Sequence, residues 1–342
     1  MIFPITEHVA KRNGHTTFYL ACGTMDAPLI IFVHGWPELS ISWRHQLPAF
    51  AALGFRAIAP DMRGYGRSTV YTRHEDYAVQ HAVSDMLGLL QSLGRDQALW
   101  VGHDWGSPVV WALASHHPEQ CVGIANLTVP YVPEGLAPQT IVPLVDRTVY
   151  PKEQFPVGQW DYQLFYEESF DRARSCFEVD IAATVRALFR RGDPANVGKP
   201  ARTAFVRKSG DFFGGLGRAP DVPMDTSVLT DVDCCAYVAA LERNGFFGPD
   251  SWYMNAARNI EYAKQARNRG KLSLPSLFLH GTYDFVCETT ANSRFADPMR
   301  NACSNLTEVY IKSGHWMAQE QPVAVNRALV RFIADKLPQL LG

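Results

Sequence analysis

The residues best suited to chemistry lie in the segment 100–111, which reads Trp-Val-Gly-His-Asp-Trp-Gly-Ser-Pro-Val-Val-Trp. Apolar residues before Gly102 have the pattern of a buried strand, and those after Pro108 are compatible with a helix, so only a very tight turn separates the two. Asp104 stands in that turn between Gly102 and Gly106, where the absence of a Cβ leaves room for a strained backbone. We expect Asp104 to be held at the end of the strand, facing a bound substrate.

An aspartate directly before a helix has an ordinary alternative role, because its side chain often accepts hydrogen bonds from the first free N–H groups of the helix. Here Ser107 and Pro108 form a suitable capping pair, so capping does not require Asp104. As a nucleophile, the Asp104 carboxylate is already ionised at neutral pH and needs no activating base. It can attack saturated carbon, which gives a covalent ester between enzyme and substrate.

Hydrolysis of that ester needs a base and a group that orients the base. His315 can take a proton from the attacking water, and Asp284 can orient its imidazole ring. Alone, Asp284 is more typical of an ordinary surface or turn aspartate than of a catalytic group. The chain order of nucleophile, acid and histidine is nevertheless the order expected when the nucleophile lies in a strand-to-helix turn. His103 and His280, which lie inside this turn and in a strand or turn, are interpreted as structural.

The oxyanion formed during ester hydrolysis requires donors that are fixed in advance. We expect these donors to be the backbone N–H groups of Trp105, the residue after the nucleophile, and of Trp36. The latter lies in the loop His34-Gly35-Trp36-Pro37-Glu38, directly after an apolar strand at 29–33.

The elements that position these residues alternate between strand and helix up to residue 130 and again from 275, which predicts an α/β fold with a largely parallel sheet. Asn13-Gly14 predicts an antiparallel hairpin at its start. Ligands of such sheets bind beyond the carboxyl ends of the strands. Asp104, Asp284 and His315 all follow predicted strands, so we expect them at the same edge of the sheet.

Between 131 and 271 this alternation is replaced by helical patterns with many aromatic, Pro and Gly residues. We expect helices at 171–190 and 230–243, the second with a capping box at Thr230 and Asp233 and a stop at Gly245. The sequence therefore predicts a core domain formed by 1–130 and 272–342. The segment 131–271 is predicted to be a mostly helical cap with connecting loops.

Composition is that of an ordinary globular protein, with 47% hydrophobic residues, 19% charged residues and a formal net charge of −2 over 342 residues. Clustered Lys and Arg are absent from the sequence, which argues against nucleic acid or an anionic membrane as a partner. Apolar runs are too short for a membrane span, and the first residues lack the apolar core of a signal peptide. We therefore expect a cytoplasmic protein.

The seven cysteines have neither a disulfide-framework pattern nor a zinc-ligand spacing, so we expect no metal and no cofactor. The adjacent Cys234 and Cys235 are interpreted as buried free thiols.

Several motifs together resemble the α/β-hydrolase-fold epoxide hydrolases over nearly the whole chain. They are His34-Gly35-Trp36-Pro37, Gly102-His103-Asp104-Trp105-Gly106, Asp284, Gly314-His315-Trp316, Trp160-Asp161-Tyr162-Gln163 and Ser251-Trp252-Tyr253-Met254-Asn255. The resemblance implies an α/β-hydrolase fold with an inserted helical cap. It also implies hydrolysis of a small-molecule epoxide by water to a vicinal diol, a detoxification reaction without a cofactor.

The resemblance further implies that Tyr162 and Tyr253 bind substrate and hydrogen-bond the epoxide oxygen, with Trp36 and Trp105 also lining the substrate site. Two phenols suit the alkoxide that develops on ring opening. Periodicity alone favours core packing for Tyr253, since it shares a helix face with Ala256, Ala257 and Ile260. The resemblance favours the catalytic role.

Other functions use the same residues. Haloalkane and haloacid dehalogenases share the aspartate nucleophile, but haloalkane dehalogenases commonly have Asn at the position of Trp36, and fluoroacetate dehalogenases carry Arg at that of Trp105. A non-catalytic ligand receptor on a hydrolase fold is the alternative outside enzymes, and a turnover assay separates it from both. The sequence leaves the epoxide, the regioselectivity, the enantioselectivity and the oligomeric state open.

Overall fold

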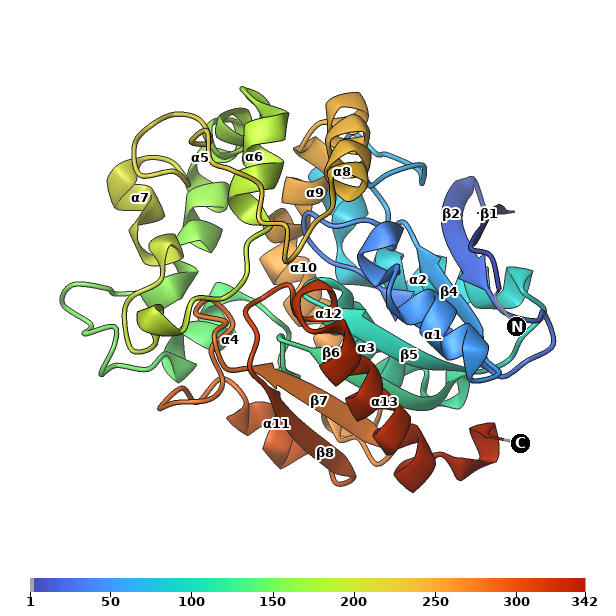
Figure 1. Cartoon of the computed structure of the whole chain (residues 1–342). Coiled ribbons are helices and arrows are strands. Elements are labelled where there is room, and N and C mark those ends of the chain that lie inside the picture. Colours follow the sequence, from blue (N-terminus) through green and yellow to red (C-terminus); the bar gives the residue numbers. More distant parts are fainter. Residues whose placement is uncertain (1–2, 342) are drawn as a thin grey trace.

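The computed structural model describes residues 3–341 and has an eight-stranded sheet in the order β1-β2-β4-β3-β5-β6-β7-β8 (Figure 1). The strands are β1 (Thr6–Arg12), β2 (His15–Cys22), β3 (Leu29–Val33), β4 (Arg56–Pro60), β5 (Ala98–His103), β6 (Cys121–Leu127), β7 (Ser276–Gly281) and β8 (Leu306–Ile311). β2 pairs antiparallel with β1 and β4, and the remaining pairs are parallel. The predicted α/β fold with a mostly parallel sheet is confirmed.

The hairpin at the start of the sheet forms where the sequence predicted it. Asn13 and Gly14 have φ angles of 49° and 76°, and Arg12 pairs with His15 across the turn. Two successive positive φ angles are the requirement of the tight hairpin turn that Asn-Gly favours.

Helices cover both faces of the sheet, which explains why the central strands are apolar throughout. Successive residues of β5 point to opposite faces. Leu99 and Val101 pack in the layer of α1 (Gln46–Ala52) and α13 (Pro322–Lys336), whereas Trp100 packs with α2 (Val79–Ser92) and α3 (Gly106–His116). The helices α11 (Asp297–Ala302) and α12 (Met317–Glu320) follow β7 and β8.

The named elements between β6 and β7 are all helical, and we call residues 128–275 the inserted segment. Figure 1 shows its green to orange helices gathered beyond one end of the sheet. They are α4 (Pro138–Ile141), α5 (Asp161–Glu178), α6 (Ile181–Leu188), α7 (Val206–Ser209), α8 (Asp231–Asn244), α9 (Phe247–Ser251) and α10 (Ala256–Ala263).

Short 3-10 helices connect many of these elements. They lie at Ser40–Trp43, His74–Tyr77, Pro118–Gln120, Val142–Leu144, Gly158–Trp160, Pro194–Asn196, Arg202–Phe205, Trp252–Asn255, Arg267–Gly270 and Pro338–Leu340. In the part of the chain that the structure describes, no helix is long and apolar enough to cross a membrane.

Three local predictions are wrong. The helix expected at 171–190 is divided between α5 and α6, because the Asp180 side chain accepts a hydrogen bond from the Ala183 N–H and begins a new helix. Ser107 does not cap α3, since that helix already begins at Gly106 and the Ser107 hydroxyl donates to the Leu127 carbonyl. Cys234 is only half-buried and Cys235 is exposed. The capping box of Thr230 and Asp233 and the stop at Gly245 are confirmed.

Candidate active site

Asp104 lies in the tight turn between β5 and α3, with a φ angle of 48°. This left-handed conformation is costly for a residue that carries a Cβ, and close packing around the turn holds it. A Cβ on Gly106 would collide with the Val33 carbonyl, and one on Gly102 would meet the Asn126 side chain. The turn therefore fits only because these two neighbours of Asp104 are glycines.

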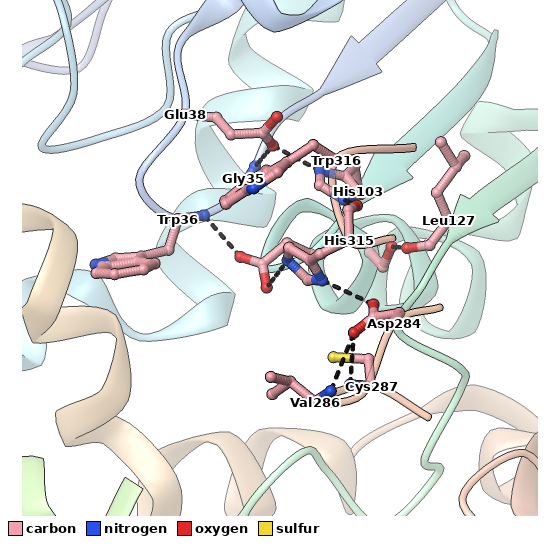
Figure 2. Close-up of polar contacts among 12 residues, drawn as sticks. Gly35, Trp36, Glu38, His103, Leu127, Asp284, Val286, Cys287, His315 and Trp316 are labelled. Atoms are coloured by element: carbon pink, nitrogen blue, oxygen red, sulfur yellow. Dashed lines mark hydrogen bonds and ion pairs between the residues drawn. The ribbon is translucent and has the colours of Figure 1, made fainter. Parts of the chain in front are cut away.

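The carboxylate of Asp104 lies beside two other predicted site residues. His315 Nε2 is 3.3 Å from Asp104 Oδ2, and His315 Nδ1 is 2.8 Å from Asp284 Oδ2. Asp284 Oδ1 in turn accepts the N–H groups of Val286 and Cys287 at 3.2 and 3.0 Å (Figure 2). Asp284 follows β7 and His315 lies between β8 and α12, so ends of three parallel strands bring the three side chains together.

The loop of His315 is fixed by the carboxylate of Glu320 in α12. Its Oε2 accepts the N–H groups of Gly314 and Gly192 at 2.9 and 3.1 Å, and its Oε1 accepts that of Trp316 at 3.1 Å. Gly192 belongs to the inserted segment, and its backbone packs directly against that of Gly314. The inserted segment thus contacts the chain next to His315.

The contact between Asp104 and His315 shifts the pKa of both groups, whose side chains are partly exposed. Desolvation acts to raise the pKa of Asp104, but the hydrogen bond and charge of His315 and the Trp36 N–H outweigh it, and the pKa is lowered. Desolvation acts to lower the pKa of His315, yet the charge of Asp284 and the hydrogen bonds to both aspartates hold it well above its usual value. The favoured resting form is an ionised Asp104 beside a protonated His315.

One of the two predicted oxyanion donors contacts the other oxygen of Asp104. The backbone N–H of Trp36 donates to Asp104 Oδ1 at 2.7 Å, and Trp36 precedes Pro37 through a cis peptide bond. A Cβ on Gly35 would collide with both Asp104 Oδ1 and the Trp105 amide nitrogen, so these two atoms lie near each other. One carboxylate oxygen therefore faces His315, and the other accepts the Trp36 N–H.

His103 and Glu38 form a buried pair next to His315, and this pairing was not predicted from the sequence. His103 Nδ1 is 2.6 Å from Glu38 Oε2, and His103 Nε2 is 2.7 Å from the His315 carbonyl (Figure 2). Both ring nitrogens of His103 therefore have a hydrogen-bond partner. Desolvation acts to raise the pKa of Glu38, but the charge of His103 and its hydrogen bond lower it overall. The ion pair supports the structural interpretation of His103 and anchors the backbone of His315.

Tyr162 in α5 and Tyr253 in the 3-10 helix after α9 both face Asp104. Their ring centroids are 5.5 Å apart, and Tyr253 lies edge-on to Trp105 at 5.2 Å. Both tyrosines line a small pocket together with Asp104 and Trp105; its other lining residues are Val129, Leu136, Trp160, Gln163, Cys287 and Phe295. Burial raises the pKa of each phenol well above its usual value, so both hydroxyls stay protonated and available as donors.

Cys287 was missed by sequence reasoning, although it lies three residues after Asp284 and its side chain lines this pocket. Among the described residues, Asp284, Cys287 and His315 each have one atom that could bind a metal ion, and these three atoms lie within 4.8 Å of one another. Asp284 and His315 are hydrogen-bonded to each other, which favours a proton-handling role for this group.

The comparisons with known proteins agree with this architecture. Residues 28–322 match the family model of the alpha/beta hydrolase fold. Epoxide hydrolase A of Mycobacterium tuberculosis is 32% identical, over 96% of this chain and 97% of that protein. The pig bifunctional epoxide hydrolase 2 is 32% identical over 95% of this chain, which spans only 54% of that longer protein.

Solved structures extend the likeness to three dimensions. Epoxide hydrolase A of Mycobacterium thermoresistibile has a TM-score of 0.79 at 30% identity, covering 97% of this chain and 98% of that one. An epoxide hydrolase from an endophytic Streptomyces has a TM-score of 0.80 at 29% identity, covering 96% and 95%. The fold, the family match and the relatives agree with one another over nearly the whole length of the chain. This chain therefore belongs to the epoxide hydrolases of the alpha/beta hydrolase fold.

Proposed function

We propose that the protein hydrolyses an epoxide to a vicinal diol through a covalent ester on Asp104. The proposal rests on one observation: the two oxygens of the Asp104 carboxylate have different partners. Oδ2 faces His315, and Oδ1 accepts the Trp36 N–H. Oδ2 is the nucleophile in this assignment, and Oδ1 is already held where an oxyanion needs donors.

Ring opening is the first half of the reaction. Asp104 Oδ2 attacks an epoxide carbon and forms a C–O bond while the bond from that carbon to the epoxide oxygen breaks. The alkoxide takes a proton from Tyr162 or Tyr253, whose hydroxyls are held protonated by burial. The proton that His315 then releases restores the phenol, so charge is balanced without an added reactant.

Esterification also converts His315 into a base. The hydrogen bond to ionised Asp104 is one of the interactions that raise the pKa of His315. The ester carries no charge, so the pKa of His315 falls when the intermediate forms. His315 becomes neutral at the stage at which a base is required.

Ester hydrolysis is the second half. His315 Nε2 takes a proton from water, and the water oxygen attacks Asp104 Cγ. The charge that develops on Oδ1 is stabilised by the N–H groups of Trp36 and Trp105. Collapse of the tetrahedral intermediate breaks the bond between Cγ and Oδ2. The diol leaves with Oδ2 and with the proton from His315. One oxygen atom of the diol therefore originates from the enzyme.

Trapping the ester tests the proposal directly. A His315→Gln variant incubated with styrene oxide is expected to gain the mass of one substrate molecule in intact-mass spectrometry, because ring opening proceeds and hydrolysis stops. The matched control is the Asp104→Ala/His315→Gln double variant, which should gain no mass. Absence of an adduct with a range of epoxides, or diol formation by Asp104→Ala alone, contradicts the mechanism.

Oxygen labelling distinguishes the ester route from direct attack of water on the epoxide. In a single turnover in H₂¹⁸O, the diol is expected to be unlabelled and the peptide that contains Asp104 to become 2 Da heavier. Direct attack would instead place the label in the diol and leave the peptide unchanged.

A further inference from the structure

A buried carboxyl group outside the proposed catalytic set connects two parts of the candidate site. Asp250 in α9 is fully buried, and its Oδ1 accepts hydrogen bonds from Trp36 Nε1 at 2.8 Å and from the Tyr166 hydroxyl at 3.0 Å. Asp250 therefore joins the loop after β3 to helix α5 of the inserted segment.

Both partners of Asp250 touch proposed catalytic groups. The backbone N–H of Trp36 donates to Asp104 Oδ1, the oxygen that becomes the oxyanion. The ring of Tyr166 stacks on that of Tyr253, with centroids 4.5 Å apart and an interplanar angle of 9°. Tyr253 also follows Asp250 by three residues. A displacement of Asp250 would thus reach both the oxyanion donor and a proposed proton donor.

The surroundings of Asp250 favour its uncharged form. Burial raises its pKa well above the usual value; the hydrogen bonds from Trp36 and Tyr166 and the charge of Arg174 lower it only in part, and Glu178 adds to the increase. Its Oδ2 has no hydrogen-bond partner among the residues described. An unpaired neutral hydroxyl costs far less in a protein interior than an unpaired charged oxygen.

We infer that Asp250 is a positioning residue, whose Oδ1 holds the Trp36 loop and the stacked rings of Tyr166 and Tyr253 in place next to Asp104. The inference rests on the proposed function, since it assigns Asp250 an effect on both halves of that reaction. A leucine has the same branching and number of side-chain heavy atoms, with somewhat larger methyl groups, and carries no desolvation cost of a buried polar group. What the carboxyl group adds is a fixed direction for two aromatic side chains.

The test compares Asp250→Leu with Asp250→Asn. Leucine removes the acceptor, whereas asparagine keeps a neutral acceptor of the same shape. For Asp250→Leu, we expect ester formation and ester hydrolysis each to slow by roughly 10- to 100-fold with little change in KM, because small misplacements of reacting groups cost that much. Asp250→Asn should restore both rates and retain the pH profile of the wild type.

Ester formation is measured as the rate of mass gain in the His315→Gln background, and ester hydrolysis as burst and steady-state kinetics with His315 intact. Circular dichroism and thermal unfolding verify the fold of each variant. Wild-type rates in a folded Asp250→Leu variant overturn the inference. It is also overturned if Asp250→Asn is as slow as Asp250→Leu, since a charged carboxylate would then be required.

A second set of variants keeps the test decisive if Asp250→Leu does not fold. Trp36→Phe/Tyr166→Phe removes both donors but retains the Trp36 backbone N–H and the stacked ring, and we expect the same slowing. Wild-type rates in this double variant, with its fold retained, contradict the inference. Where Asp250→Leu folds, adding it to this background should slow the reaction no further, and an additive loss also contradicts the inference. The adduct on Asp104 is verified first in the otherwise wild-type His315→Gln protein, so failure of the proposed function is recognised separately.

Discussion

At the scale of single residues, the protonation of His315 depends on which of its two aspartates carries charge. Asp284 accepts two backbone N–H groups on Oδ1 and His315 on Oδ2, and it takes no part in bond formation in the proposed mechanism. In that mechanism, Asp104 loses its charge on becoming an ester. The carboxylate that orients His315 and the carboxylate that sets the timing of its deprotonation are therefore different residues.

This arrangement predicts the effect of Asp284→Asn. The charge of Asp284 raises the pKa of His315, so its removal lowers that pKa. His315 acts in its neutral form, and the acid limb of ester hydrolysis should therefore move to lower pH. The plateau rate should fall by roughly 10²-fold or more, because the weaker, misoriented imidazole is a poorer base. Burst kinetics across pH measure both quantities; an acid limb that moves to higher pH contradicts the assignment.

The two pocket tyrosines give a second prediction at this scale. In Tyr162→Phe/Tyr253→Phe, ring opening should be abolished because the alkoxide has no phenol to stabilise or protonate it. The mass gain of the His315→Gln variant then disappears. Tyr150→Phe is a suitable control, since that hydroxyl contacts backbone atoms of Ala201 and Phe285 and Tyr150 does not line the pocket with Asp104. Near-normal turnover of the double variant, with its fold retained, shows that the tyrosine assignment is wrong.

At the scale of elements, the turn between β5 and α3 depends on backbone packing. A Cβ on Gly106 would collide with the Val33 carbonyl of β3, and backbone of a central strand cannot easily move. We expect Gly106→Ala to destabilise the fold by about 1–3 kcal/mol through overpacking, as measured by urea unfolding. It should also slow ester formation, since Asp104 moves with the turn.

Gly88→Ala is the matched control for that substitution. Gly88 lies within α2, and its Cβ would meet only the Arg12 side chain, at 3.3 Å. Alanine in a helix interior is favoured over glycine by roughly 0.5–1 kcal/mol, so this variant should be more stable than the wild type. Equal effects of the two substitutions would contradict the packing explanation.

The helices and strands also show which features could be predicted from sequence patterns. Strands that are buried throughout and mostly apolar, such as β3 and β7, were predicted well because burial on both faces leaves a clear pattern. The division between α5 and α6 was missed because it depends on one capping interaction of Asp180, in a stretch whose helical periodicity continues. The cap assigned to Ser107 was wrong because the strained conformation of Asp104 lets α3 begin at Gly106.

At the scale of the whole molecule, the inserted segment is joined to the sheet region by side chains distant in sequence. Arg44 donates to the Val228 carbonyl at 2.8 Å and pairs with Asp233 at 3.0 Å, both in the inserted segment. It also donates to Gln319 of α12 at 2.7 Å. Such partners are invisible to local patterns, and Asp250 was missed for the same reason. Asp284 and His315 were found because strand ends identified their common edge.

Arg44→Ala should therefore weaken the attachment of the inserted segment. Loss of hydrogen bonds to a half-buried guanidinium costs roughly 1.5–3 kcal/mol each where the partner stays buried. We expect faster hydrogen exchange around Val228 and earlier proteolytic cleavage in the inserted segment. Arg267→Ala is the control, because its pair with Glu119 is exposed and worth at most about 1 kcal/mol. Identical exchange in both variants contradicts the proposed attachment.

The contact between Gly192 and Gly314 has a consequence for how this protein can vary. A side chain at either position would collide with the backbone of the other. A second substitution at the opposite position cannot relieve this clash, because glycine is already the smallest residue. The two positions are therefore constrained jointly. In a combinatorial library randomised at both sites and selected for turnover, we expect glycine to be retained at both, because the inserted segment and the histidine loop can diversify only around this fixed point.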